Sequence, residues 1–167
     1  MIIFFSLFFL ALPAAWAEDS SVENLLSKYL QAHSEKNTEL LEECFHPKAH
    51  IAYVTIAGKI STPTLPGFLH LHRSIFRDAG EIIETFKNTE IEIYQGMAHV
   101  STDYVYSIDG KEQEGRDYFV LVREKDEWVI MSLMYTLKFE EPEYIREARR
   151  KRMTRIRAER MKKLKAQ

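Results

Sequence analysis

One carboxylate stands in an otherwise apolar strand-like segment, and no other side chain of the sequence is better suited to chemistry. Asp117 lies in residues 115–139, GRDYFVLVREKDEWVIMSLMYTLKF, directly before the run YFVLV. If Asp117 faces the interior, burial raises the pKa of its carboxyl, which can then act as a neutral hydrogen-bond donor or as a general acid or base near neutral pH. The alternative is that Asp117 faces solvent, or anchors Arg116 or a backbone amide, and has no such role. We predict that Asp117 lies in a pocket.

Four further side chains are predicted to line the same pocket as Asp117. Tyr29 lies on the apolar stripe of the predicted first helix, and a buried Tyr hydroxyl normally has a hydrogen-bond partner. Tyr53 alternates with apolar neighbours on the predicted first strand, so it either lines the cavity or points outward. Ile130 and Met134, on the last predicted strand, complete the predicted lining.

The remaining polar groups are weaker candidates for a site. His99 and Asp103 share one face of a predicted strand, where they form either a catalytic pair or part of an exposed face. His46 and His50 are four residues apart, but Pro47 breaks the helix that would bring them together, so we expect no zinc site. The sequence contains no nucleophile motif, phosphate loop or dinucleotide fingerprint, and we predict no cofactor.

Capping residues mark three predicted helices that must position these side chains. Ser20 and Glu23 form a capping-box pattern at the start of a first helix, whose apolar residues recur with helical spacing up to about residue 36. Asn37 can cap a second, short helix. Thr64 can cap a third helix that ends at Gly80.

Strand-like segments make up most of the remaining chain. A period of two covers residues 49–57, with a brief return at residues 60–62. After the third helix, four strands are predicted at residues 84–95, at residues 97–108 and on both sides of the polar turn at 124–127, with Asp109-Gly110 as a hairpin turn. This order of elements predicts an α+β domain with a curved antiparallel sheet.

The order of these segments resembles a known superfamily. The segments SKYLQAHSEKNTELLEECFHPKAHIAYV, GKISTPTLPGFL and GRDYFVLVREKDEWVIMSLMYT, over about residues 20–139, are similar to nuclear transport factor 2-like proteins, and within them to the SnoaL-like and putative lumazine-binding groups. The resemblance implies a cone-shaped barrel in which a bent sheet wraps the N-terminal helices and leaves a pocket at its wide end. It also implies a homodimer formed through the outer face of the sheet.

The resemblance also implies roles for particular residues. In the ketosteroid isomerases of the superfamily, a Tyr on the first helix and a protonated Asp on a late strand donate hydrogen bonds to an oxyanion, and an Asp on the first strand moves the proton. The matching positions hold Tyr29, Asp117 and Tyr53. Because Tyr53 has no carboxylate, ketosteroid isomerisation by that mechanism is not expected.

The first 17 residues, MIIFFSLFFLALPAAWA, have the apolar run and small-residue end of a secretory signal peptide. We predict cleavage after Ala17 and a periplasmic or secreted protein; an uncleaved anchor is the alternative, because the usual N-terminal Lys or Arg is missing. Cys44 is the single cysteine and is interpreted as a core residue.

The charge is divided between an acidic domain, residues 18–139, and a basic tail, residues 140–167, which holds 11 of the 23 Lys and Arg. Pro142 and a run of strong helix formers predict a helix over residues 143–165. This basic helix is either solvated, on the acidic domain or on a second copy, or binds an anionic membrane surface. Nucleic acid is not expected as a partner, because export removes most of the opportunity.

Two classes of function remain. The first is an exported small-molecule-binding or interaction module with a partly apolar pocket, without enzymatic activity and with a ligand that the sequence does not identify. The second is an isomerase, cyclase or dehydratase in which Asp117, alone or with His99 or Asp103, moves a proton. The missing carboxylate at Tyr53 favours the first.

Overall fold

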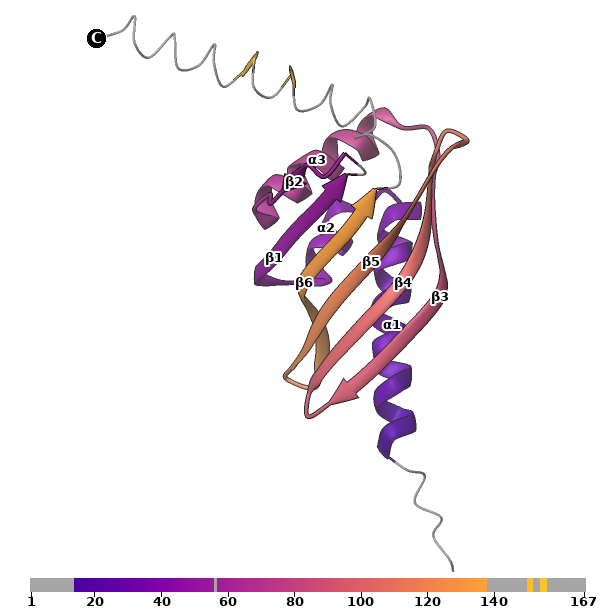
Figure 1. The fold of residues 1–167 in the computed structure, drawn as a ribbon, viewed down its shortest axis with the longest axis vertical. Helices are drawn as coiled ribbons and strands as arrows, with labels where there is room; N and C mark the ends of the chain where they lie inside the picture. The colour runs from indigo at the N-terminus through magenta and orange to yellow at the C-terminus, as the bar shows by residue number, and fades with distance from the viewer. Residues whose placement is uncertain (1–13, 56, 138–149, 152–153, 156–167) are drawn as a thin grey trace, which may run out of the picture.

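A curved sheet of six strands forms the body of the molecule (Figure 1). The computed structural model describes residues 14–55, 57–137, 150–151 and 154–155 of the 167. The strands are β1 (Phe45–Thr55), β2 (Ile60–Ser61), β3 (Ile82–Tyr94), β4 (Met97–Ile108), β5 (Lys111–Glu124) and β6 (Glu127–Leu137). Their order is β2-β1-β6-β5-β4-β3, so the sheet has two free edges and is not a closed barrel. The predicted α+β fold with a curved sheet is confirmed.

One neighbouring pair of strands differs from the predicted antiparallel arrangement. β1 and β6 run parallel, whereas every other pair is antiparallel. The connection from β1 to the β3–β6 meander includes a helix, which is long enough to return the chain in either direction. The meander itself uses short hairpins and is therefore antiparallel throughout.

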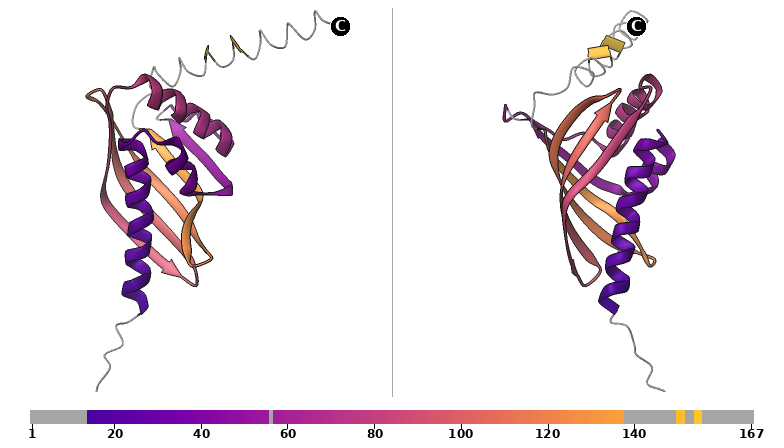
Figure 2. Two further views of the ribbon diagram at one scale, coloured as in Figure 1. Left: turned by 180° about the vertical axis from the view of Figure 1, so that it is seen from behind. Right: turned by 90° about the vertical axis from the view of Figure 1, so that its right-hand side faces the viewer.

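The helices α1 (Ala14–Ser34), α2 (Thr38–Glu43) and α3 (Leu65–Asp78) lie on one side of the curved sheet (Figure 2, right). The predicted apolar stripe of α1 is confirmed, since Val22, Leu26 and Tyr29 are all buried. The helix starts at Ala14, so the start predicted at Ser20 is wrong, because the helix-favouring residues before it continue the helix.

Both short-range caps predicted for α2 and α3 are confirmed. The Asn37 carboxamide oxygen accepts a hydrogen bond from the Leu40 backbone N–H at 2.9 Å. The Thr64 hydroxyl accepts one from the Gly67 backbone N–H at 3.3 Å. α2 ends at Glu43 and β1 begins at Phe45, four residues before the predicted strand.

Three two-residue loops connect the strands of the meander. Asp109 and Gly110 have φ of 51° and 76°, and the loops at residues 95–96 and 125–126 also have two positive φ values. Positive φ at both positions is what a type I′ turn requires, and this turn matches the twist of the flanking strands. The predicted hairpins are therefore confirmed.

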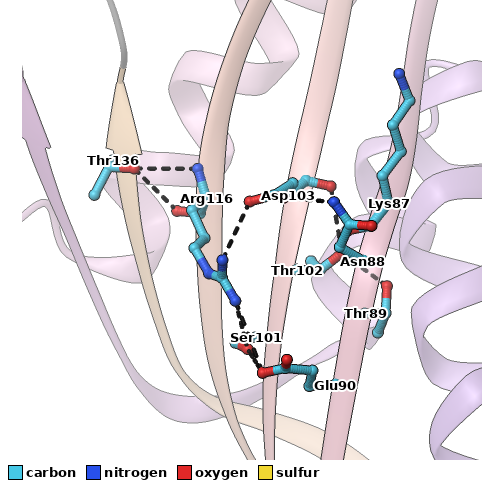
Figure 3. A network of polar contacts seen from close by, with 9 residues as sticks. All are labelled: Lys87, Asn88, Thr89, Glu90, Ser101, Thr102, Asp103, Arg116 and Thr136. Carbon is cyan, nitrogen blue, oxygen red and sulfur yellow. Dashed lines mark hydrogen bonds and ion pairs between the residues drawn. The ribbon is translucent and has the colours of Figure 1, made fainter.

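A bulge in β3 changes which of its residues face the helices. The pairing of β3 with β4 shifts between Lys87 and Glu90. Asn88, with φ of 52°, donates a hydrogen bond from its amide nitrogen to an Asp103 carboxylate oxygen at 2.9 Å, and the hydroxyl oxygens of Thr89 and Thr102 are 2.8 Å apart (Figure 3). Alternation along a strand would otherwise move one half of β3 to the opposite face. The bulge keeps both halves packed on the core.

A second bulge lies in β6. Val120 pairs with Ser132 and Leu121 pairs with Ile130, so Met131 is the additional residue. As a result Ile130 and Leu133, three residues apart, are both buried.

Two of the predicted segments lie at the ends of the chain. The signal peptide predicted at residues 1–17 and the basic helix predicted at residues 143–165 lie mostly outside the described residues; within the tail, residues 150–151 and 154–155 are helical. Among the described helices, none combines the length and the apolar character needed to cross a membrane.

Candidate functional site

A cavity of about 60 Å³ lies between α1, α3 and the sheet face that carries the helices. By the volume that a single water needs, it has room for on the order of five water molecules. Its wall combines aromatic, aliphatic and titratable side chains. They are Tyr29, His33, Phe68, Leu71, His72, Ile75, Glu84, Tyr104, Tyr106, Gln113, Asp117, Tyr135 and Leu137.

Asp117 reaches the cavity from the middle of β5. Burial alternates along this strand, and Gln113, Asp117 and Phe119 face inward whereas Arg116 and Tyr118 face the other side. The Asp117 residue is 3% exposed. Of the two orientations that the sequence left open, the structure has the inward one.

A second carboxyl in the cavity, that of Glu84, was missed by the sequence reasoning. Glu84 lies on β3, two residues from Ile82 and two from Phe86, and its side chain is 6% exposed. The only sequence signal was its alternation with these two apolar residues. That signal did not show which face of the strand is buried, because the neighbouring Ile83 on the opposite face is also apolar.

Burial raises the pKa of both members of this carboxyl pair, Glu84 and Asp117. For Glu84, the loss of hydration is the larger cause and repulsion from Asp117 adds to it. For Asp117, the loss of hydration is the cause. Neutral carboxylic acids can donate as well as accept hydrogen bonds, so the raised pKa values widen the pH range over which the pair can present O–H donors to the cavity.

Two neutral histidines from different helices line the same cavity as the carboxyl pair. The Nδ1 atoms of His33 and His72 each lie 3.0 Å from the backbone carbonyl oxygen four residues earlier, of Tyr29 and Phe68. A carbonyl only accepts, so Nδ1 carries the hydrogen and Nε2 keeps its lone pair. Burial lowers the pKa of His33 to about 3 and that of His72 to about 4, and each imidazole is neutral at pH 7.

Glu84 has one oxygen without a hydrogen-bond donor. Its Oε2 lies 3.2 Å from His33 Nδ1, a distance typical of an ion pair, yet no side chain of the described residues donates to it. Both observations agree if the single Nδ1 hydrogen points to the Tyr29 carbonyl and the ring is uncharged. The contact is therefore not a salt bridge, and Oε2 has no hydrogen-bond partner among the described residues.

Tyrosine rings form much of the remaining wall. Burial, followed by the proximity of Glu84 and Asp117, raises the pKa of the Tyr29 hydroxyl. Tyr104 crosses β5 at Gly115 and donates its hydroxyl hydrogen to the Thr136 carbonyl at 3.1 Å. A side chain at Gly115 would collide with the Tyr104 ring and with that carbonyl, so glycine is required there.

Three of the five predicted pocket residues do not line this cavity. Tyr53 is buried and stacks on Tyr135, with ring centroids 5.1 Å apart, so it supports the wall from behind. Ile130 is fully buried in the core. Met134 is 51% exposed on the opposite face of the sheet, because the bulge at Met131 reverses the alternation that would have placed it beside Ile130. Its prediction as a pocket residue is corrected accordingly.

His99 and Asp103, the alternative catalytic pair, lie away from the cavity. They occupy the face of β4 opposite to the buried Ala98 and Val100. Asp103 contacts Asn88 and Arg116 there (Figure 3). Within the part of the chain that the structure describes, no cluster of three His, Cys, Asp or Glu side chains could hold a metal ion.

The comparisons with known proteins agree with this architecture. The model of the family described as "Putative lumazine-binding" matches residues 17–136. No curated protein matches the sequence.

Solved structures with the same fold share little sequence with this chain. A nuclear transport factor 2-like protein of unknown function from Shewanella baltica is 19% identical, covering 76% of this chain and 96% of its own, with a TM-score of 0.59. A putative dehydratase from Streptomyces avermitilis is 13% identical, covering 74% and 97%, with a TM-score of 0.63. A putative scytalone dehydratase from Novosphingobium aromaticivorans is 12% identical, covering 75% and 87%, with a TM-score of 0.63. The chain therefore belongs to the putative lumazine-binding family and has the nuclear transport factor 2-like fold.

Proposed function

We propose that this protein binds a small organic molecule in the cavity between α1, α3 and the sheet, and that the carboxyl pair orients it. One observation carries the proposal: Glu84 and Asp117 arrive from different strands and are both buried at the same cavity. Burying a carboxyl is costly, and a purely structural role is served more cheaply by an apolar side chain. Polar groups that converge in an otherwise apolar cavity are typical of ligand sites.

The rest of the wall indicates the general shape of the ligand. Phe68, Leu71 and Ile75 of α3 form an apolar side, and the carboxyl pair with Gln113 forms a polar side. A ligand with one polar end and a short apolar body satisfies both. Molecules larger than this cavity would fit only if its wall moved.

Native mass spectrometry of the full chain tests the binding. The protein purified from its own host is compared with Asp117→Leu, which removes the inward carboxyl, and with Tyr118→Leu, a matched control at the adjacent, outward-facing position. A bound molecule that is kept in the control and lost in Asp117→Leu supports the proposal. If neither the unchanged protein nor the control carries a molecule, and no small fragment perturbs the cavity residues in NMR spectra, the proposal is wrong.

Proton transfer is the second candidate function, and one observation favours it. The cavity is lined by two carboxyls whose pKa values burial raises and by two imidazoles whose pKa values burial lowers and whose Nε2 atoms keep a lone pair, and groups of these two types serve as general acids and bases in proton transfer. Dehydration needs both, an acid for the departing hydroxyl and a base for the carbon-bound proton. Two structures of similar fold are described as putative dehydratases.

The two candidate functions are separated by turnover. Small β-hydroxy carbonyl compounds would be incubated with the unchanged protein and with Asp117→Asn and His72→Gln, and the enone product followed by absorbance. Catalysis predicts product that each variant reduces at least about 100-fold. Binding without product leaves the first proposal standing alone.

The location of the protein is a further part of the proposal. The signal-like residues 1–17 support export, with cleavage after Ala17, and the basic tail of residues 140–167 supports contact with an anionic surface. Mass spectrometry of the protein from the host should give an N-terminus at Glu18. Sedimentation with anionic vesicles but not with zwitterionic ones would support the surface contact.

A further inference from the structure

The carboxyl pair has no cationic partner in its cavity. Among the described residues that line it, none is Lys or Arg. Apart from Glu84 and Asp117, the titratable side chains that face the cavity are His33, His72, Tyr29, Tyr104, Tyr106 and Tyr135. The two imidazoles are neutral above about pH 5, because burial lowers their pKa values to about 3 and 4. The wall can therefore become negatively charged but not positively charged at neutral pH.

Glu84 has an oxygen ready to accept from a ligand. Its side chain is 6% exposed, and Oε2 receives no hydrogen bond from any described residue. The adjacent His33 Nδ1 hydrogen is used by the Tyr29 carbonyl. Buried acceptors in folded proteins nearly always receive a hydrogen bond, so this oxygen indicates a donor that arrives with the ligand.

Carboxyl groups differ from amides in that they can ionise. A neutral hydrogen-bonding group is already supplied by Gln113, and an amide at either acidic position would supply another without the risk of burying a charge. What a carboxyl adds is the capacity to become negative. That capacity stabilises a complex only when a positive charge arrives, since the two acids repel each other when both ionise.

Aromatic rings line the same cavity as the carboxyl pair. Tyr29, Phe68, Tyr106 and Tyr135 all contribute to the wall. The face of an aromatic ring attracts a cation, and the attraction increases when water is excluded. An aromatic wall with a carboxylate is a recurring arrangement for ammonium groups.

We propose that the ligand of this cavity is a small organic cation, a primary ammonium compound whose N–H groups are donated to Glu84 and Asp117 while its alkyl body contacts α3. The inference rests on the proposed binding function and specifies the chemical class of its ligand. One carboxyl gives up its proton on binding, so that R–NH₃⁺ and the protonated acid yield the ammonium–carboxylate pair and one H⁺ released to solvent. The volume of about 60 Å³ admits roughly four to six non-hydrogen atoms.

The test compares two probes that differ only in charge. Propylammonium and propan-1-ol each have four non-hydrogen atoms, and each is titrated into the full chain while NMR shifts of the cavity residues are followed. Fragments of this size bind with dissociation constants on the order of millimolar. We expect propylammonium to bind at least about tenfold more tightly than propan-1-ol.

The pH dependence of binding supplies the second readout. Propylammonium stays charged between pH 5 and 8, as a Lys side chain does. Because binding releases a proton, its affinity should rise with pH, by up to about tenfold per unit. Glu84→Gln should reduce the rise, whereas Glu112→Gln, an exposed change on β5, should not alter it.

Three results would overturn the inference, and they separate it from the proposed function. Preferred binding of propan-1-ol in the cavity would leave the binding function intact and refute the charge preference. Affinity for propylammonium that falls as pH rises would show that the acids are needed in their protonated form, with the same consequence. Shifts in neither titration would count against the ammonium class and, together with the absence of any co-purified molecule, against ligand binding itself.

Discussion

Replacing Asp117 by Asn should make the protein more stable than the unchanged protein at neutral pH, with little difference near pH 4. The two side chains have nearly the same shape, and at low pH both are neutral. Asp117 is 3% exposed, and burial raises the pKa of its carboxyl in the folded protein. In the unfolded chain the carboxyl ionises with its ordinary pKa of about 3.9.

The direction of the stability change follows from this difference in the Asp117 pKa between the folded and the unfolded state. A raised pKa in the folded state means that stability is fully present below the ordinary pKa and is lost as the pH rises toward the folded value. Within that window each pH unit lowers the free energy of unfolding by about 1.4 kcal/mol. Asn does not ionise, so the variant does not lose stability in this way. Over two pH units inside the window, its free energy of unfolding should exceed that of the unchanged protein by about 2.7 kcal/mol.

The histidines make the comparison with the unchanged protein necessary. Burial lowers the pKa of His33 from 6.5 to about 3 and that of His72 from 6.5 to about 4, so their contribution is lost as the pH falls below 6.5. In the unchanged protein this slope opposes that of the two carboxyls, and the total stability can change little between pH 4 and 6.5. The difference between variant and unchanged protein isolates Asp117.

Urea unfolding from pH 4 to pH 7.5, followed by the fluorescence of the buried Trp128, measures the difference. Glu112→Gln removes an exposed carboxyl from the same strand and is the matched control, expected to follow the unchanged protein. If Asp117→Asn is destabilised by the same amount at every pH, Asp117 is ionised in the folded protein. The raised pKa of the Asp117 carboxyl would then be refuted.

Three further predictions concern other parts of the fold. The imidazole signals of His33 and His72 should not titrate in NMR spectra between pH 5 and 8, because their pKa values are about 3 and about 4, and a titration near 6.5 would contradict their burial in the neutral form. Gly115→Ala should lower the free energy of unfolding by about 3 kcal/mol or more, since the added carbon meets the Thr136 carbonyl; a loss below about 1 kcal/mol in urea unfolding would show that the strands adjust. Met134→Glu, on the exposed outer face of the sheet, should change the free energy of unfolding by no more than about 0.5 kcal/mol. The same change should convert the homodimer that the family resemblance implies to a monomer in sedimentation experiments. An unchanged sedimentation coefficient would refute the proposal that this face self-associates.

Local chemistry was sufficient to predict most of the elements. Asn37 and Thr64 satisfy free amides at helix starts within three residues of themselves. Asp109-Gly110 adopts the positive φ values of a two-residue hairpin turn, and the Asp109 carboxylate also accepts hydrogen bonds from the backbone N–H groups of Gly80 and Glu81. The apolar stripe of α1 could be read because its spacing of three and four residues is the same before and after folding. Asp117 was identified because one acid in a long apolar strand is conspicuous in any fold.

The composition of the site depended on contacts between segments far apart in the chain. β3 carries apolar residues on both faces, so only the packing of α1 against it decides that Glu84 points inward. Met134 points outward because the bulge at Met131 reverses the alternation, and no residue type at that position announces a bulge. His33 and His72 are 39 positions apart on separate helices, and their rings meet at 5.3 Å only in the folded protein.

The sequence by itself therefore determined the order of the helices and strands, their caps and turns, and one of the two cavity acids, because each of these depends on neighbours within a few residues. The tertiary structure decided which strand face became the inside, and with it the second acid and the two neutral imidazoles. A single bulge residue is enough to exchange the two faces of a strand, and its position is set by pairing with the neighbouring strand.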